Sequence, residues 1–365
     1  NNDPPLMKIL DKYIVKRFLS SFVLAIALLL LIIIAFDVSE KIDEFIDRQA
    51  PFHDILFKYY FNFIPYFINL FSPLFVFISV VFVTSKMAGN TEIVAILSGG
   101  VSFRRLLIPF VFTGVFLAAF SFVLQNFLIP PANAVRLEFE YNYIRKNKPQ
   151  GARNIHMQMS PGEYVYMESF NFKSNRAMMF TLETIDFENG MTRKLSANMA
   201  IYDSLSGKWQ MTEVYDRRMK DSVEELRYLP KLDTTLAILP KDFNKDMENV
   251  DVMDFFELNE HIKKQRMRGA DNIKQLEVER HRRIAFPFAT VILTIIGVAV
   301  SSRKTRGGTG LHIGIGLALS FGFILFMQVS STFATNGNLP PMLAVWIPNI
   351  VFAGIALLLV KWAPK

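Results

Sequence analysis

A short polar segment between two long apolar runs carries the residues best placed to do chemistry. It begins at Glu92, passes through Ser98-Gly99-Gly100 and ends at Arg104-Arg105. A carboxylate and two guanidinium groups form ion pairs and charge-assisted hydrogen bonds. The same residue types also suit a plain position beside a membrane, because a carboxylate complements the start of a helix dipole and arginine favours the interface. Both interpretations stay open at this point.

Motifs for catalysis and metal binding are absent from the sequence. It contains no Gly-x-x-x-x-Gly-Lys-Ser/Thr, no Gly-x-Ser-x-Gly and no His-Glu-x-x-His, and its histidines lack metal-ligand spacing. The glycines at 307–310 follow no strand, so they predict a loop rather than a phosphate-binding site. Because cysteine is absent, thiol catalysis and disulfides are excluded. We predict no catalytic residue, no metal, no cofactor and no ATP hydrolysis by this chain alone.

The polar segment predicts a short helix near 91–100. Thr91 can cap its start, Glu92 lies in its first turn, and Gly99-Gly100 can end it before Ser102 caps the next helix. Uncharged runs at 59–85 and 106–135 flank the segment, and each is longer than the about 20 residues that cross a bilayer. The short helix is therefore expected to lie beside the membrane.

Composition places the chain among membrane proteins. It is 51% hydrophobic and 20% charged, with a mean hydropathy of +0.26. Since its middle third is polar, the hydrophobic residues must be concentrated in blocks. The net charge of +7 does not indicate nucleic-acid binding, because the basic clusters flank apolar runs and no basic patch is interleaved with aromatic residues.

The apolar blocks predict a polytopic α-helical membrane protein with six transmembrane helices. We expect a polar connection at 37–58, kinks at Pro65 and Pro73, and an end of the third helix before Pro130-Pro131. Small residues recur every four positions in the fifth helix, at 310, 314, 318 and 322, and predict close packing within this chain. The six segments are 18–36, a stretch within 59–85, 106–127, 284–302, 309–333 and 342–360.

Between the third and fourth helices the pattern changes to that of strands. The segments 163–168, 178–188, 194–203 and 208–215 alternate apolar and polar residues and are separated by turns rich in Asn, Gly, Ser and Asp. They predict an inserted all-β domain, a sandwich or open barrel. A helix at 254–268 ending at Gly269 leads back to the membrane. We place the domains at 7–130, 131–275 and 276–365.

Charge in the connections predicts the orientation. If the start of the first helix lies inside, then the inside segments are strongly basic and the short outside connections are acidic or uncharged. The β domain then lies outside, which in a bacterium with two membranes is the periplasm.

The polar segment resembles the coupling helix of the LptF/LptG (YjgP/YjgQ) family, the permeases of the lipopolysaccharide-export ABC transporter. The resemblance rests on Glu92, Ser98-Gly99-Gly100, Ser102 and Arg104-Arg105, and it extends over nearly the whole chain, including the segment from Glu277 to Pro287. It implies that the β domain is a β-jellyroll and that Glu92, Ser98, Gly99, Gly100, Arg104 and Arg105 form the contact to an ATPase.

The resemblance also implies partners. An LptF-like and an LptG-like subunit pair as a heterodimer in the inner membrane, and an LptB-like ATPase dimer binds ATP on the inside. Lipopolysaccharide then passes through the β-jellyrolls and an LptC-like protein to an LptA-like bridge. The chain itself needs no cofactor, and no nucleic acid is involved.

Two cations are candidates for binding lipopolysaccharide phosphates. Lys41 follows the first helix and Arg136 follows the third, so both are expected near the periplasmic face of the inner membrane, where the lipopolysaccharide phosphates lie. The alternative is that each pairs with a neighbouring carboxylate, Lys41 with Asp37, Asp43 or Glu44 and Arg136 with Glu140. Two other functions stay open: a membrane-anchored periplasmic binding or scaffold protein, and a permease for another lipid.

Overall fold

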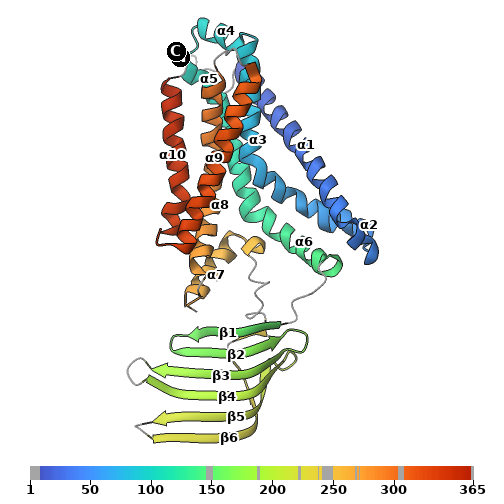
Figure 1. Cartoon of the computed structure of the whole chain (residues 1–365), viewed down its shortest axis with the longest axis vertical. Coiled ribbons are helices and arrows are strands. Elements are labelled where there is room, and N and C mark those ends of the chain that lie inside the picture. The colour runs from blue at the N-terminus through green and yellow to red at the C-terminus, as the bar shows by residue number, and fades with distance from the viewer. Residues whose placement is uncertain are drawn as a thin grey trace, which may run out of the picture. The chain divides into compact units, whose positions relative to one another are not determined.

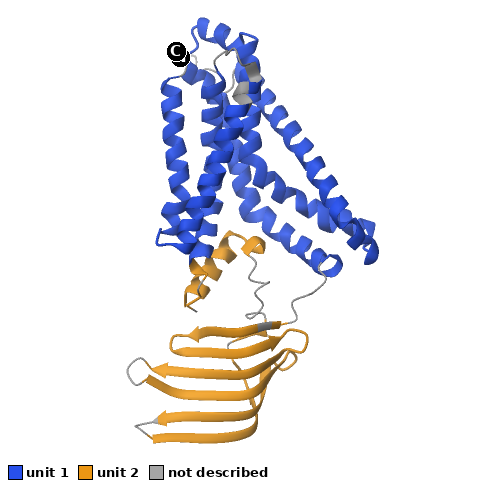
Figure 2. Ribbon diagram, in the orientation of Figure 1, with its two compact units in different colours: residues 1–144, 274–365 blue, residues 145–273 orange. Residues whose placement is uncertain are grey.

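The computed structural model describes residues 9–144, 151–186, 190–220, 223–236, 238–240, 250–267, 269–270, 272–302 and 308–362. The chain forms two compact units (Figure 2). The first combines residues 1–144 with 274–365, and the second comprises residues 145–273. The second unit is therefore inserted between two halves of the first.

The first unit is a bundle of long helices (Figure 1). Among the described residues, six helical segments are long and apolar enough to cross a membrane. This confirms the predicted polytopic architecture. The main helices are α1 (Ile9–Asp47), α3 (Phe61–Gly89), α5 (Phe103–Val123), α8 (Ile273–Ser301), α9 (Gly308–Asn336) and α10 (Pro341–Lys361). Figure 1 shows the short helix α4 (Glu92–Ser98) at one end of the bundle, here called the α4 end.

Helix α1 is longer than expected, because it continues through the segment predicted as a polar connection. It ends at Asp47, and α2 (Phe52–Asp54) and the π-helical segment η1 (Ile55–Tyr60) then lead directly into α3. The extension is stabilised by the pair Asp37–Lys41 at helical spacing. Phe45, near its end, packs among the rings of Tyr59 and Phe139.

The predicted end of the third helix before Pro130 is wrong. Helix α5 continues through the π-helical segment η2 (Leu124–Leu128) into α6 (Ile129–Tyr143). Pro130 lies in the first turn of α6, where the missing N–H has no intrahelical partner to lose. The wider turn of η2 allows the chain to pass the prolines without leaving the helical path.

Three apolar clusters of described residues hold the bundle together. One joins α1, α3, α4, α5 and α8 and includes Phe18, Val80 and Phe110. A second joins α3 to α8, α9 and α10, and the third joins α1 and α6 to the start of α3 around Phe45. A β-carbon at Gly316 of α9 would overlap a ring carbon of Phe77, whereas at 310, 314 and 322 it would meet nothing within 4 Å. The predicted small face of this helix is therefore wrong as a packing face within this chain, and Gly316 provides the close approach instead.

The second unit contains an antiparallel sheet in which six described strands pair in chain order. This confirms the predicted inserted all-β domain, and each predicted strand segment lies in a strand as far as the structure describes it. Alternate residues such as Val165, Phe180 and Trp209 form a fully buried apolar core. The strands are β1 (Gly151–Ser160), β2 (Glu163–Asn171), β3 (Arg176–Asp186), β4 (Gly190–Asp203), β5 (Lys208–Lys220) and β6 (Val223–Thr234).

Helix α7 (Phe255–Met267) completes this unit, and its two ends confirm the predicted return helix. Asp254 accepts hydrogen bonds from the backbone N–H groups of Phe256 and Glu257 at 2.7 and 2.8 Å, and the Glu257 carboxylate accepts one from the Asp254 N–H at 3.0 Å. Gly269 has φ +67° and closes the helix, a conformation that glycine adopts without strain.

Candidate functional site

Helix α4 lies in the chain between two membrane-spanning segments, and local backbone geometry ends it. Gly99 donates its N–H to the Ala95 carbonyl at 3.0 Å, and Gly100 has φ +85°, so the predicted end at Gly99-Gly100 is confirmed. Ser102 accepts a hydrogen bond from the Arg105 N–H at 3.3 Å, as predicted. The cap predicted at Thr91 is wrong, because Thr91 adopts a left-handed conformation with φ 62° and its side chain caps nothing.

The carboxylate of Glu92 contacts helix α1. Tyr13 donates its hydroxyl to Glu92 at 2.9 Å, and the Arg17 guanidinium pairs with it at 3.3 Å. Asn90 donates a further bond at 3.2 Å. Partial burial opposes ionisation of Glu92, but the bonds from Tyr13 and Asn90 and the charge of Arg17 outweigh it and lower the pKa of this carboxyl below its ordinary value. Glu92 is therefore held in its charged form.

The two adjacent arginines differ in their surroundings. Arg105 reaches α1 and makes two hydrogen bonds, of 2.8 and 2.6 Å, to the carboxylate of Asp11. Asp11 is buried, with 6% of its surface exposed. The Arg104 side chain is exposed and makes no hydrogen bond or ion pair to another described residue. Arg104 is thus available to a partner, whereas Arg105 is engaged within the chain.

One face of α4 is open to the surroundings. Ile93 is buried in the apolar cluster with α1 and α5, while Val94 is 57% exposed. Ser98, Gly99 and Gly100 are also exposed. The helix therefore presents a surface of small and apolar residues, with Glu92 at its start and Arg104 beyond its end.

Lys41 lies away from the α4 end, in the second half of α1. Its ammonium donates to Asp37 at 2.5 Å and to the hydroxyl of Tyr59. The two tyrosines that precede α3 also use Asp37, since Tyr59 donates to one of its oxygens at 3.2 Å and Tyr60 to the other at 3.0 Å. Lys41 is therefore part of a partly buried network rather than an isolated surface cation.

Arg136 lies on α6 and pairs with Glu140 at 3.7 Å. Its guanidinium also lies over the ring of Tyr66 on α3, 5.8 Å from the centroid. Phe139, on the same helix, packs against Tyr59 with ring centroids 5.4 Å apart, so α6 contacts the network that holds Lys41. Both candidate cations have the carboxylate partners that the alternative interpretation names.

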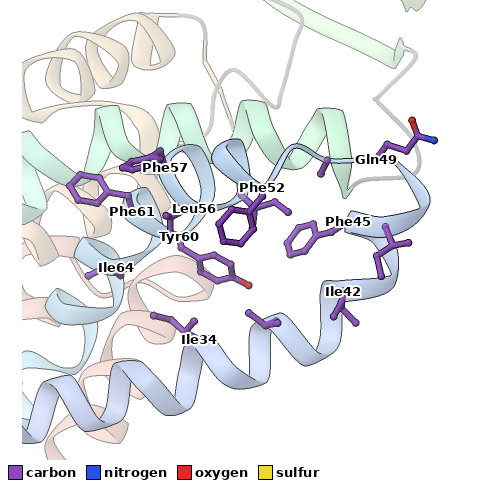
Figure 3. Close-up of a pocket in the computed structure, with 14 residues that line it drawn as sticks. Ile34, Ile42, Phe45, Gln49, Phe52, Leu56, Phe57, Tyr60, Phe61 and Ile64 are labelled. Atoms are coloured by element: carbon purple, nitrogen blue, oxygen red, sulfur yellow. The ribbon is translucent and has the colours of Figure 1, made fainter.

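An apolar cavity of about 820 Å³ lies beside this network. The second half of α1 forms one wall with Ile34, Val38 and Ile42. The segment from Phe52 to Ile64 forms the other, and Figure 3 shows Phe52, Tyr60 and Phe45 turned towards the space between the walls. The lining consists almost entirely of aliphatic and aromatic side chains, with Gln49 as a polar exception. Such a cavity accommodates hydrocarbon rather than a polar solute.

The sequence model of the family described as "Lipopolysaccharide export system permease LptF/LptG" matches residues 12–362. The chain belongs to the LptF/LptG family. No curated protein matches the chain. Family membership makes it a permease, a class of transporter subunit, and the match includes every predicted site residue from Lys41 to Arg136.

Several polar residues of this LptF/LptG chain escaped prediction. Asn69 of α3 donates to Gln125 of the π-helical segment η2, and Ser121 donates to Asn69 at 2.6 Å. A polar side chain in a membrane-spanning segment is costly unless it is satisfied, so the three residues tie α3 to the end of α5. Asp11, Tyr13 and Arg17 were also missed. The sequence feature that could have identified all of these residues is a polar side chain that lies inside or beside an apolar run.

Proposed function

We propose that this chain is a permease subunit of an ABC transporter that extracts lipopolysaccharide from the inner membrane and passes it to a periplasmic bridge toward the outer membrane. The observation that carries the proposal is α4, a seven-residue helix with an open face between two membrane-spanning segments. An anchor needs one membrane helix, whereas six candidate spans, a structured connection and family membership suit a transporter.

Helix α4 is the proposed contact to a separate LptB-like ATPase, which binds and hydrolyses ATP. Val94, Ser98 and Gly99 form a surface without long side chains, which can fit into a groove of the partner. Arg104 supplies an exposed charge. Glu92 and Arg105 complete the proposed contact, and both also pair with side chains of α1.

Lys41 and Arg136 are the proposed contacts for lipopolysaccharide phosphate. Each is paired with a carboxylate, so phosphate has to replace Asp37 or Glu140 as the partner. Phosphate is a competitive acceptor, because it offers several charged oxygens to one cation. The neighbouring apolar cavity supplies a surface for hydrocarbon within reach of the same part of α1.

The remaining partners follow from this role. A paralogous LptF/LptG subunit would complete the transport path, and LptC-like and LptA-like proteins would receive the cargo from the β unit. The basic charge of the connections near α4 favours a cytoplasmic position for α4. With the helices in the inner membrane, the β unit would then lie in the periplasm.

Reconstitution tests the proposal. The full chain, its paralogue and the ATPase are placed in proteoliposomes that contain lipopolysaccharide, and ATP-dependent release to an LptA-like acceptor is measured. We expect release that requires all three proteins. Release of phospholipid instead would favour a permease for another lipid, and binding of the acceptor without ATP-dependent release would favour a scaffold. Mass spectrometry of lipid retained by the purified chain identifies the cargo directly.

A further inference from the structure

The backbone connects α4 to α3 and α5. In addition, side chains at the start of α4 and just after its end contact α1, which is not adjacent to α4 in sequence. Glu92 at the start of α4 contacts Tyr13 and Arg17 of α1 at 2.9 and 3.3 Å. Arg105, just after α4, holds Asp11 of α1 by two bonds of 2.8 and 2.6 Å. Two separate ion pairs therefore connect the α4 end of α1 to the segment that contains α4.

The two contacts are geometrically specific. The planar guanidinium of Arg105 meets both oxygens of the buried Asp11 carboxylate, an arrangement that fixes orientation as well as distance. The Arg17 guanidinium also lies over the ring of Tyr13, 4.3 Å from its centroid, so the two α1 partners of Glu92 support each other. Ile14 of α1 packs in the same buried cluster as Ile93 of α4.

Helix α1 differs from α3 and α5, the helices on either side of α4 in the chain, because it has no feature that would bend it. It spans 39 residues without proline or glycine, a length of about 58 Å at 1.5 Å per residue. By contrast, α3 contains Pro65 and Pro73, and α5 contains Pro109 and continues into a π-helical segment. Prolines and π turns are where helices bend, so α1 is the stiffest of the three.

We propose that Asp11 and Arg17 are positioning residues that join α1 to α4, so that a displacement of α4 moves α1 as a rigid lever. The inference rests on the proposed function, because the ATPase is what displaces α4. The other half of α1 carries Lys41 and one wall of the apolar cavity. Movement of α4 would therefore reach the cargo-facing part of the chain through α1, although α1 is not its neighbour in sequence.

A distance measurement tests the joint without any partner. Since the chain lacks cysteine, spin labels can be attached at Lys16→Cys on α1 and Val94→Cys on α4 of the full chain in detergent. We expect a narrow distance distribution that broadens when Asp11→Asn and Arg17→Gln are combined. The control is Asp54→Asn, which removes the carboxylate of a distant exposed ion pair to Lys58. An unchanged distribution in the double variant would overturn the proposal.

A coupling measurement tests the lever. In the reconstituted complex, Asp11→Asn and Arg17→Gln are expected to leave ATPase association and ATP hydrolysis intact while lipopolysaccharide released per ATP falls by about tenfold, equivalent to about 1.4 kcal/mol. A purely structural role would lower hydrolysis and release together. The Arg17 side chain is only partly buried, so the single variant Arg17→Gln is expected to fold and keeps the test available if Asp11→Asn impairs folding.

The outcomes separate the lever from the proposed function. A broadened distance distribution with unchanged release per ATP would show a joint that transmits nothing, and it would overturn the proposal. If the unmodified complex releases no lipopolysaccharide, the proposed function fails, and the spin-label distances alone then decide whether Asp11 and Arg17 join the two helices.

Discussion

The carboxylate of Glu92 already has partners within the chain, because Tyr13 and Arg17 of α1 both contact it. A change of charge at this position therefore acts twice. It removes a negative charge from the proposed ATPase contact, and it places a cation opposite Arg17.

We expect Glu92→Lys to weaken ATPase association and to lower ATP-driven lipid release, since a cation would then replace the carboxylate that faces the ATPase at the proposed contact. The measurements are co-purification with the ATPase and release in proteoliposomes. Glu260→Lys on α7 is the matched control, because Glu260 forms an exposed pair with Lys264 far along the chain. Wild-type association together with wild-type release in Glu92→Lys would exclude the coupling role.

Lys41 and Arg136 make a prediction about cargo. Combining Lys41→Glu with Arg136→Glu should lower lipopolysaccharide crosslinking and export while complex assembly and basal ATP hydrolysis stay normal. The reversed charges repel phosphate, and each such contact contributes about 1.5–3 kcal/mol. Photo-crosslinkers at the two positions provide the readout. Normal export with no captured lipopolysaccharide would mean that the cations serve only their pairs with Asp37 and Glu140.

At the scale of the sheet, Asp216 of β5 links two strands. It is buried, with 5% exposure, and it accepts hydrogen bonds from Arg193 of β4 at 2.8 Å and from Arg218 at 3.0 Å. Burial opposes ionisation, but the bonds from Arg193 and Arg218 outweigh it and lower the pKa of this carboxyl.

We expect Asp216→Asn to lower the free energy of unfolding of the β unit by about 1.5–3 kcal/mol, the range for hydrogen bonds to charged groups. Because the folded pKa is lowered, this stabilisation is present above the ordinary Asp value of about 3.9 and is lost as the pH falls through the folded pKa. Urea unfolding monitored by Trp209 fluorescence, with the other tryptophans replaced, should show the two proteins converging in acid. Asp233→Asn, which removes a weak exposed pair with Lys231 of 3.9 Å, should change little.

Helix packing in the membrane unit makes a prediction at Gly316. A β-carbon there would overlap the buried ring of Phe77, so Gly316→Ala should destabilise the bundle by about 1–3 kcal/mol. Gly322→Ala on the same helix meets nothing within 4 Å and should be neutral or slightly stabilising. Thermal unfolding in detergent compares the two variants. Equal stability would mean that α9 does not pack on α3 as described.

The whole molecule is expected to expose α4 and the β unit on opposite sides of the membrane. In spheroplasts, an impermeant thiol reagent should label Leu205→Cys, whose side chain is fully exposed in the turn after β4, and should not label Ser98→Cys on α4. Permeabilised cells control for reactivity, because both sites should then react. Labelling of Ser98→Cys in intact spheroplasts would reverse the assigned orientation.

Features determined by the sequence alone are those whose physical cause is local or periodic. Crossing hydrocarbon requires long apolar runs, so the six spans could be predicted. A sheet with one buried face requires alternation, so the strands could be predicted as well. The end of α4 at Gly99-Gly100 depends on the backbone freedom of glycine, which is a property of the residue itself.

The tertiary structure alone decided how the charged residues are used. Arg105 finds Asp11 across 94 positions and Arg17 finds Glu92 across 75, separations that leave no periodic trace in the sequence. Pro130 likewise reads as a helix end until the π-helical turn before it is known. The face of α9 that packs closely depends on where Phe77 lies. Each of these outcomes is a choice among partners or paths that are locally equivalent, and only the packing of distant segments distinguishes them.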